Sequence, residues 1–595
     1  LEKEYYYTIH WSRYGKIPDF RQPEQTDFQR YIIVSDAQSN TDWMLRDLFN
    51  WNVEYSFYPI DRKELTDEVR SEIENGYPHF VCVIPQASEP ENISGLEAVQ
   101  ERGIRKLNDF LKILIDTASG REIRLTIVTE QAISVRPNEQ NYLHSAVHGF
   151  GMCLTHEYPN LKCCLCDVDS LESFADHFQQ IVNQDINPFV AVRDGELYVR
   201  TVSKKRHAFS SREYAVKRNA VYLITGASGG IGSCIAEYLL NEGASGLILI
   251  DSDRTESFTK EKQTRIERFR SRCSFFRHYA MNVGDELLLR NVFQDIQSSG
   301  VSLKGIFHCA GRADAGLAVN STPAQYDSVF SSKVCGSWLI EKLSEEVRPD
   351  FVLFFSSEIC TNGEAGMSLY TAGNFFMNEL ANACSRRRSN VKSFMFTTWH
   401  DVGMGMRSNT NLDLIFRTMS NQQALSKMFR SLPLNDPGII IGDLNEEMLP
   451  QLADKLQNVA FQLDFELREH LSTICSEKKE YELIGDIPEK SRSRLISGAK
   501  IKDVTLRGAE RFSLLQKDIG ICYSKVLGYD EIDIHTSFFE LGGDSILMTR
   551  LHLLMNERYP QSVTLTDLYA YNTVYDLSVY LEQKLRTESK PEPVA

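Results

Sequence analysis

The sequence predicts an α/β protein with two Rossmann-like doubly wound subdomains, followed by a small all-α domain of four helices. Three observations support this prediction. Short apolar runs alternate with helical stretches over residues 1–215, a second and stronger strand–helix series begins near residue 219, and residues 511–584 show only helical periodicity. We therefore expect subdomains at 1–215 and 216–475, a charged linker at 476–510 and a helical domain at 511–585.

Bulk properties narrow the class of protein. A chain of 595 residues is too long for one ordinary domain. Its net charge of -16 and the lack of a basic stripe predict no nucleic-acid partner. Because no apolar run approaches the length of a membrane span and no signal peptide opens the chain, we expect a cytoplasmic protein without a membrane partner. Leu1 in place of an initiator Met suggests a piece of a longer polypeptide.

The thirteen cysteines show no disulfide framework. Their one cluster, CCLC at 163–166, lies in an apolar run and has no second Cys/His cluster that would complete a zinc site. We expect core cysteines of a strand, no bound metal and a reducing compartment.

In residues 1–215, the apolar runs at 31–37, 79–85 and 123–130 predict buried strands of a parallel sheet. Residues 189–202 predict a hairpin closed by an Asp-Gly turn. No glycine-rich phosphate loop follows any of these strands, so this half has the pattern of a nucleotide-binding fold without its binding loop.

In residues 216–475, the predicted strands are 221–226, 246–251, 305–311 and 351–357, separated by helical stretches. The turn TGASGGIG, at 225–232, joins the first strand to a helix. Its glycines would let the backbone approach a pyrophosphate at a helix N-terminus, and Asp251 ends the next strand where an acid would hold ribose hydroxyls. We expect a dinucleotide site. A merely tight turn would leave the downstream polar residues unexplained.

Those residues are Ser357, Tyr370 and Asn374, with Lys333 upstream. A tyrosine can donate a proton to a carbonyl if a cation lowers its pKa of roughly 10. Lowering this pKa to about 7 requires roughly 4 kcal/mol at about 1.36 kcal/mol per unit. Short-chain dehydrogenases usually place a lysine four residues after the tyrosine, where this chain has Asn374. By that pattern alone the site is incomplete.

The chain resembles the ketoreductases of modular polyketide synthases, in which the lysine and the asparagine exchange places. The matching stretches are 330–340, 351–381 and the tryptophan-containing loop at 397–406. The resemblance implies that Tyr370 donates the proton, Ser357 hydrogen-bonds the carbonyl oxygen, Lys333 contacts the nicotinamide ribose and tunes Tyr370, and Asn374 supports Lys333. Residues 1–215 resemble the degenerate structural subdomain that precedes the catalytic subdomain.

The same resemblance implies NADPH as cofactor, with NADH as the alternative. Asp251 and Asp253 would repel an adenosine 2′-phosphate, whereas Arg254 would accept one. Asn282 replaces the usual adenine-contacting aspartate. The residues expected at the cofactor are Thr225, Gly226, Ser228, Gly229, Gly230, Ile231, Gly232, Asp251, Arg254, Asn282, Val283, Ala310 and Gly311.

Two positions that mark the handedness of the alcohol in this family are altered. The first marker is Ala313-Asp314-Ala315, and Met367 stands where a tryptophan would precede the tyrosine by three. The configuration of the product is therefore left open.

Near the C-terminus, the stretch FFELGGDSILMTRL spans residues 538–551. A serine at a helix start is usually an N-cap, but this explains neither the paired glycines nor the preceding aromatic residues. The stretch resembles an acyl or peptidyl carrier domain, which implies that Ser545 carries 4′-phosphopantetheine. Its Gly-Gly-Asp-Ser-Ile form is similar to carriers of trans-acyltransferase or hybrid peptide–polyketide synthases.

Together these resemblances imply an assembly-line enzyme that reduces a β-keto acyl thioester on its own carrier to the β-hydroxy acyl thioester. Two alternatives remain: reduction of an α-keto acyl thioester in a depsipeptide-forming synthetase, and a non-catalytic carrier scaffold with a vestigial reductase. The implied partners are the tethered substrate, a ketosynthase, an acyltransferase acting in trans and a phosphopantetheinyl transferase.

Overall fold

The computed structural model divides into two compact units, and each is described by itself. Unit 1 comprises residues 1–403, 419–443 and 455–464, and unit 2 comprises 404–418, 444–454 and 465–595. The structure describes residues 5–16, 30–36, 54–76, 79–118, 121–136, 139–158, 160–184, 187–206, 214–252, 259–313, 315–400, 402, 415–445, 460–468, 504–509, 511–527, 529, 531–538, 541, 548, 551–552, 554–555, 558–559, 562–564, 567–568 and 571–588.

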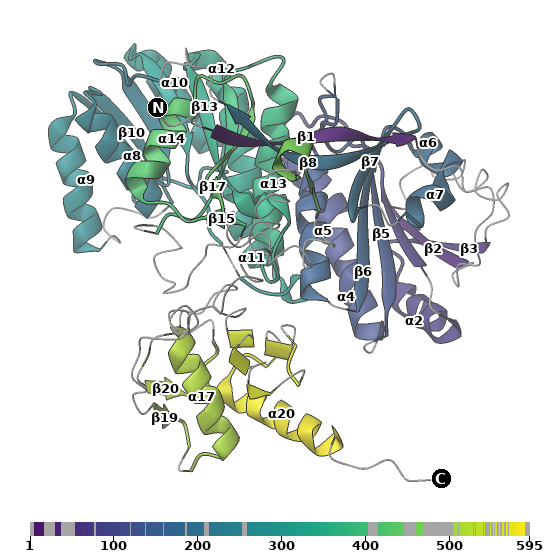
Figure 1. Cartoon of the computed structure of the whole chain (residues 1–595). Coiled ribbons are helices and arrows are strands. Elements are labelled where there is room, and N and C mark those ends of the chain that lie inside the picture. Colours follow the sequence, from purple (N-terminus) through teal and green to yellow (C-terminus); the bar gives the residue numbers. More distant parts are fainter. Residues whose placement is uncertain are drawn as a thin grey trace, which may run out of the picture. The chain divides into compact units, whose positions relative to one another are not determined.

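One sheet of sixteen strands runs through unit 1 (Figure 1). Below, residues 1–215 are called the first half and the remainder of unit 1 the second half. Fifteen of the strands follow one another across the sheet in the order β11 (Phe275–Ala280), β10 (Gly246–Asp251), β9 (Val221–Thr225), β12 (Leu303–His308), β13 (Phe351–Ser357), β14 (Val391–Phe396), β16 (Gly438–Ile441), β1 (Tyr5–Lys16), β8 (Glu196–Arg206), β7 (Phe189–Arg193), β6 (Leu161–Val168), β5 (Ile123–Glu130), β4 (His79–Ile84), β2 (Arg30–Ser35) and β3 (Glu54–Pro59).

The strands of the second half, β11 to β16, pair in parallel throughout. Their order places the first strand in sequence, β9, between β10 and β12, which is the doubly wound arrangement that the sequence predicts. The central strands β9, β10 and β13 are buried, mainly apolar runs, as expected where helices cover both faces of a parallel sheet, whereas the edge strand β11 is only partly buried. The polar residues that follow the strands therefore collect at the carboxyl edge of the sheet.

Helices connect these strands. In the first half they are α2 (Leu65–Asn75), α3 (Ile93–Gln100), the π-helical turn η1 (Glu101–Arg105), α4 (Lys106–Ala118), α5 (Ser145–Glu157), α6 (Leu171–Asp176) and α7 (Phe178–Val182). In the second half they are α8 (Gly230–Asn241), α9 (Lys260–Arg272), α10 (Glu286–Ser299), η3 (Ala318–Asn320), α11 (Pro323–Phe330), the π-helical turn η4 (Ser331–Gly336), α12 (Ser337–Val347), η5 (Glu358–Thr361), α13 (Ser368–Cys384) and α14 (Asn421–Ser431).

The first half has its own set of parallel strands, which confirms the predicted strands at 31–37, 79–85 and 123–130. The predicted hairpin is β7–β8, closed by Asp194 and Gly195 with φ of 52° and 69°. Cys163 and Cys166 are buried in β6, as expected of core cysteines.

Strand β1 joins the two halves, a role that the sequence did not reveal. It pairs antiparallel with β8 along its length and with β16 through Tyr7 and Ile440. The short strand β18 (Gln462–Leu463) also pairs with β8. The division at 215/216 therefore crosses one continuous sheet and stays a prediction about domains.

Helices α5 and α13 pack side by side where the halves meet (Figure 1). Gly149 of α5 permits this close approach, because an added Cβ would lie 2.7 Å from both the Thr371 carbonyl oxygen and the Phe375 Cβ. The first half thus lies directly against the helix that begins two residues before Tyr370.

In the C-terminal segment of unit 2, residues 465–595, the described elements are α17 (Leu514–Leu527), α20 (Val574–Glu588) and two paired three-residue strands, β19 (Thr505–Arg507) and β20 (Glu531–Asp533). Buried residues include Cys522, Tyr523, Met548 and Leu551, a small apolar core. The strands differ from the purely helical pattern expected, and β19 begins inside the predicted linker; three-residue strands are too short to give a recognisable alternation. Among the residues that the structure describes, no helix is long and apolar enough to cross a bilayer.

Candidate active site

The glycine-rich turn lies between β9 and α8, at the carboxyl edge of the sheet. Gly226 has a φ of +64°, and an added Cβ there would lie 3.0 Å from the Ala310 backbone nitrogen. At Gly232 an added Cβ would lie 2.4 Å from the Gly226 carbonyl oxygen. Helix α8 begins at Gly230 and its N-cap, Gly229, offers no side-chain cap. The backbone N–H groups at the start of α8 fit the pyrophosphate of a dinucleotide.

Asp251, at the end of β10, is 4% exposed and bonded within the protein. One carboxylate oxygen accepts from the Ser228 N–H at 2.8 Å, and the other lies 3.0 Å from His278 Nε2. The carboxylate therefore holds the glycine-rich turn in shape, a contact that the sequence did not predict beside its expected role toward the ribose.

Arg265 of α9 also reaches this turn, and its guanidinium donates to the Ser228 carbonyl at 3.0 Å. Asp253 and Arg254, which the sequence singles out here, lie outside the described residues. Arg265 was missed because it stands in the middle of a charged helix, where periodicity predicts a solvated side chain. Its Nε is buried and has no hydrogen-bond partner in the structure.

The remaining predicted cofactor residues lie near the ends of β9, β11 and β12. Thr225 Oγ1 accepts from the Ala310 N–H at 3.1 Å and lies 2.8 Å from His308 Nδ1. Gly311 lies against Lys333, whose Cε would be 2.8 Å from an added Cβ. Asn282 Oδ1 accepts from Ser331 Oγ at 2.6 Å and from the Gly284 N–H at 3.0 Å, so this amide oxygen already has partners within the protein. Val283 is buried beside it.

Lys333, Asn374 and Tyr370 meet as the exchanged pattern requires. The Lys333 Nζ donates to Asn374 Oδ1 at 2.9 Å and lies 5.1 Å from the centre of the Tyr370 ring. Asn374 Nδ2 donates to the Tyr370 carbonyl at 2.8 Å, which fixes the amide. The lysine comes from the π-helical turn η4 and the other two from α13. A cation is thus held beside the phenol although the usual lysine position is an asparagine.

Burial is the main cause of the pKa shifts of Lys333 and Tyr370. It lowers the pKa of Lys333 to about 8 and raises the pKa of Tyr370 to about 12, the latter opposed by contacts with Asn374 and Ser357. The expected lowering of the Tyr370 pKa is therefore not a property of the protein groups alone, because desolvation of the phenolate outweighs the hydrogen bonds with Asn374 and Ser357.

Ser357 ends β13, and its hydroxyl accepts from the Ile359 N–H at 3.4 Å. The next residue, Glu358, was not singled out from the sequence. Burial raises the pKa of its carboxyl to about 7, and its charge contributes to raising the pKa of Tyr370. The position of this glutamate directly after Ser357 is a feature that inspection of the sequence could have used.

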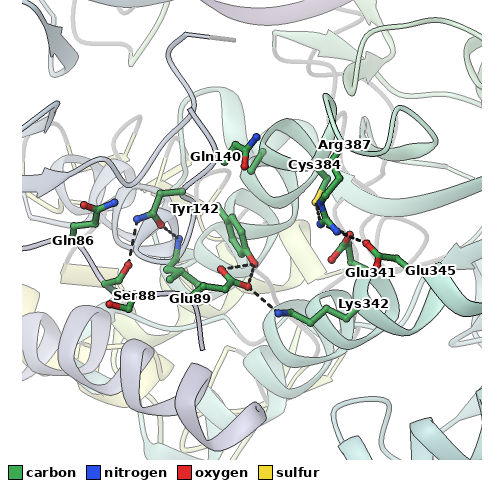
Figure 2. A pocket seen from close by; sticks show the side chains of 14 residues that line it. Gln86, Ser88, Glu89, Gln140, Tyr142, Glu341, Lys342, Glu345, Cys384 and Arg387 are labelled. Carbon is green, nitrogen blue, oxygen red and sulfur yellow. Dashed lines mark hydrogen bonds and ion pairs between the residues drawn. The ribbon is translucent and has the colours of Figure 1, made fainter. Parts of the chain in front are cut away.

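A polar groove of about 760 Å³ lies apart from these residues (Figure 2). Its charged side chains are paired with one another: Lys342 with Glu89 at 3.0 Å, and Arg387 with Glu341 at 2.8 Å. None of the predicted site residues lines it. The groove is therefore not the candidate active site.

Ser545, the expected phosphopantetheine attachment point, lies outside the described residues. Among the described residues near it, Met548 and Leu551 are buried. The Trp399 end of the loop at 397–406 is buried, and most of that loop is also outside the described residues.

Three family models match the chain in separate regions. Residues 220–401 match the KR domain, residues 520–581 match the phosphopantetheine attachment site, and residues 34–202 match the Rossmann fold domain of the polyketide synthase extender module SpnB. The three regions follow the order that the sequence predicts, and the attachment-site match includes position 545.

Curated relatives are large synthases. The chain is 27% identical over 366 residues to naringenin synthase of Pestalotiopsis fici, covering 60% of this chain and 13% of the relative. It is 23% identical over 541 residues to polyketide synthase PksN of Bacillus subtilis, covering 88% of this chain and 9% of the relative. The chain thus spans only a small part of the length of the relatives it matches.

A solved structure supports the fold. The first ketoreductase of the tylosin polyketide synthase superposes with a TM-score of 0.61 at 22% identity, covering 77% of this chain and 96% of that one. The domain matches, their order and this likeness agree with the Lys333–Asn374–Tyr370 arrangement. The chain therefore contains a region that matches the KR domain, preceded by a region that matches the Rossmann fold domain of a polyketide synthase extender module and followed by a region that matches the phosphopantetheine attachment site.

Proposed function

We propose that the chain reduces a β-keto acyl thioester, delivered on a phosphopantetheine arm at Ser545, to the β-hydroxy acyl thioester with NADPH. The observation that carries the proposal is the buried Lys333 ammonium, 2.9 Å from Asn374 Oδ1 and above the Tyr370 ring, at the same sheet edge as the glycine-rich turn. A carbonyl reductase needs a cation-supported proton donor beside a dinucleotide, and these groups supply that combination.

The bound dinucleotide would supply a hydride to the β-carbon. The Tyr370 hydroxyl would give its proton to the carbonyl oxygen as the C=O bond becomes C–OH, and the Ser357 hydroxyl would donate a hydrogen bond to that oxygen. The Lys333 ammonium would stabilise the resulting phenolate, and Asn374 would keep the ammonium in place through its 2.9 Å hydrogen bond. The protein thus holds the carbonyl, moves one proton and orients the cofactor.

The proposal favours NADPH over NADH through Arg265. Its guanidinium reaches the carbonyl of Ser228 in the glycine-rich turn, and its Nε is buried without a partner. The Arg265 side chain as a whole is 25% exposed, so a 2′-phosphate would meet the accessible part of its guanidinium, and Arg suits phosphate recognition. The charge of Asp251 opposes this preference, although both of its carboxylate oxygens already have partners in Ser228 and His278.

The test uses the whole chain and small thioesters in solution. A β-keto acyl and an α-keto acyl N-acetylcysteamine thioester are supplied separately with NADPH, and cofactor oxidation is followed. We expect faster turnover of the β-keto substrate. Faster turnover of the α-keto thioester would instead assign the depsipeptide role, and no turnover of either would leave only the carrier function.

A further inference from the structure

The backbone between Ser357 and Tyr370 is held by side chains of the first half. Arg200 of β8, 3% exposed, donates to the carbonyls of Cys360 at 2.6 Å and Thr361 at 3.0 Å. His156 of α5 lies 3.1 Å from the Asn362 carbonyl oxygen. The segment that links the two predicted catalytic positions therefore depends on the half of unit 1 that has no glycine-rich loop.

Glu157, the last residue of α5, makes the most specific of these contacts. It is 1% exposed, and its two carboxylate oxygens accept from two different segments: Oε2 from the Ala318 N–H at 2.7 Å and Oε1 from the Gly366 N–H at 3.2 Å. The two segments are also bonded directly, because the Gly316 N–H donates to the Gly366 carbonyl at 2.9 Å.

Both segments adjoin the reacting groups. Gly366 lies four residues before Tyr370 and has a φ of +76°, so it forms the bend that leads into α13. Ala318 follows the end of β12, where Gly311 lies against the Lys333 side chain. One carboxylate thus couples the entry to the proton-donor helix with the loop that follows the expected cofactor strand.

Burying the Glu157 carboxylate costs free energy of folding. Burial raises the pKa of Glu157 to about 7, against which the N–H groups of Ala318 and Gly366 act. A buried carboxylate is retained more readily when its geometry serves another purpose, and its two acceptor oxygens match two backbone donors.

We propose that Glu157 is a positioning residue for the reduction: it fixes the Gly366 bend relative to the Ala318 loop, and so sets how Tyr370 faces the substrate carbonyl. The inference rests on the proposed function. Because the orientation of the carbonyl relative to the proton donor decides which face is reduced, Glu157 also influences the handedness of the product.

The test is Glu157→Gln, with Glu379→Gln as the matched control. Glutamine keeps the shape but presents an amide NH₂ to one of two N–H donors, so one hydrogen bond is lost. Glu379 on α13 is buried, has a pKa raised to about 7 by burial, and accepts from the Ser134 N–H of the first half at 2.9 Å. It has the same chemistry at the same junction, nine residues beyond Tyr370.

In the full chain with a β-keto thioester in solution, Glu157→Gln should lower kcat about ten- to a hundredfold, as misplacement by about 1 Å can do. The ratio of product enantiomers should shift, whereas the KM for NADPH should change little. Glu379→Gln should leave kcat and the enantiomer ratio at wild-type values. Equal kcat and equal enantiomer ratios in the two variants would overturn the proposal.

A second measurement is independent of turnover. Amide hydrogen exchange should accelerate in the peptides containing Ala318 and Gly366 in Glu157→Gln but not in Glu379→Gln. Unchanged exchange would overturn the proposal that Glu157 holds these two segments together. If Glu157→Gln does not fold, Glu157→Asp, shorter by one methylene, should show the same kcat loss, and wild-type kinetics would refute the inference. A wild-type chain that reduces no thioester would refute the proposed function instead. The hydrogen-exchange measurement would still decide whether Glu157 holds the Ala318 and Gly366 segments together.

Discussion

Lys333 and Asn374 show how two ordinary residues form a site through their spacing. A buried ammonium is costly, and here it is stabilised by one amide oxygen at 2.9 Å and by the carbonyl of Phe355 at 3.4 Å. Asn374 is in turn held by the Tyr370 carbonyl of the preceding helical turn. The proposed proton donor Tyr370, the Lys333 ammonium and the Asn374 amide that supports it are therefore mutually fixed before a substrate arrives.

Tyr370→Phe removes the proposed proton donor and leaves the ring in place. We expect thioester reduction to fall by roughly 10²–10⁴-fold, the usual contribution of general acid catalysis. NADPH should still bind, because the phenol is not among the residues expected at the pyrophosphate. Cofactor oxidation and cofactor titration measure the two properties, and near wild-type turnover would reject Tyr370 as the donor.

The pH dependence should report Lys333. Its pKa is lowered to about 8, so the ammonium is present below that pH and is lost as the pH rises through it. The value of kcat/KM should therefore decline above about pH 8. Lys333→Arg should abolish this decline even at low activity, because a guanidinium stays protonated.

Glu358 provides the control for this pH profile, since its pKa is raised to about 7. Glu358→Gln should keep the decline near pH 8. If that variant loses the decline while Lys333→Arg retains it, the titrating group is Glu358 and the role given to Lys333 is wrong.

Arg265 should decide between the two nicotinamide cofactors. Arg265→Ala removes a charge-assisted hydrogen bond worth about 1.5–3 kcal/mol, so kcat/KM for NADPH should fall roughly ten- to a hundredfold with little change for NADH. Arg268→Ala is the control, because Arg268 lies on the same helix but pairs with Glu237. A wild-type kcat/KM for NADH tenfold above that for NADPH would contradict the preference.

At the scale of elements, the π-helical turn η4 and the junction of α5 with α13 position the site. The turn η4 interrupts an otherwise α-helical run between α11 and α12, and Lys333 lies within it. π-Helical turns often occur at functional sites, because they redirect a side chain. Here the lysine approaches Asn374 from a neighbouring helix rather than from the tyrosine's own.

The α5–α13 junction should couple stability to activity. Gly149→Ala would place a Cβ 2.7 Å from the Thr371 carbonyl oxygen and the Phe375 Cβ, so we expect destabilisation of about 1–3 kcal/mol and lower turnover as α13 shifts. Gly76→Ala is the control, since no atom lies within 4 Å of its added Cβ. Thermal melting and thioester turnover measure the effects; equal melting temperatures and equal turnover in both variants would contradict the junction's role.

Local patterns were sufficient for some elements and insufficient for others. Strand β5 spans Ile123–Glu130, the run predicted, because its closely spaced β-branched and apolar residues mark a buried strand in the sequence. Strand β1 was missed because its partners, β8 and β16, lie about 190 and 430 residues away in sequence, and pairing at that distance leaves no local signal. The turn η4 was missed because π geometry has no periodicity to detect over six residues.

The residues of the candidate site likewise divide into those predicted from the sequence and those that were missed. Ser357, Tyr370 and Asn374 were singled out along one strand and helix, whereas their roles and that of Lys333 followed from the family resemblance. The structure brings Lys333 to Asn374 and Tyr370. Arg265, Glu358 and Glu157 were missed, because their contacts come from tertiary packing of helices whose sequences read as ordinary charged or buried faces.

At the scale of the whole molecule, one chain combines a match to the KR domain at 220–401 with a match to the phosphopantetheine attachment site at 520–581. Under the proposed function these two regions are a reductase and its own carrier. Tethering a substrate raises its effective concentration at a site on the same chain to about the millimolar range for short flexible linkers. The carrier domain is therefore expected to deliver substrate without a tight contact.

Ser545→Ala should separate delivery from chemistry. It should abolish loading by a phosphopantetheinyl transferase, seen by mass spectrometry, yet leave reduction of a free thioester unchanged. Loading that persists in the variant would place the arm on another residue. Loss of free-thioester turnover would mean that Ser545 supports the fold.

The most direct test of the central claim is the intact mass of the loaded chain. The wild-type protein is loaded with a β-keto acyl phosphopantetheine arm and mixed with NADPH, with Tyr370→Phe treated identically. The account predicts that the acyl chain on wild-type protein gains the mass of two hydrogens, and that the variant retains the keto mass over the same period. An unchanged keto mass on the wild-type chain, with cofactor bound, would contradict it.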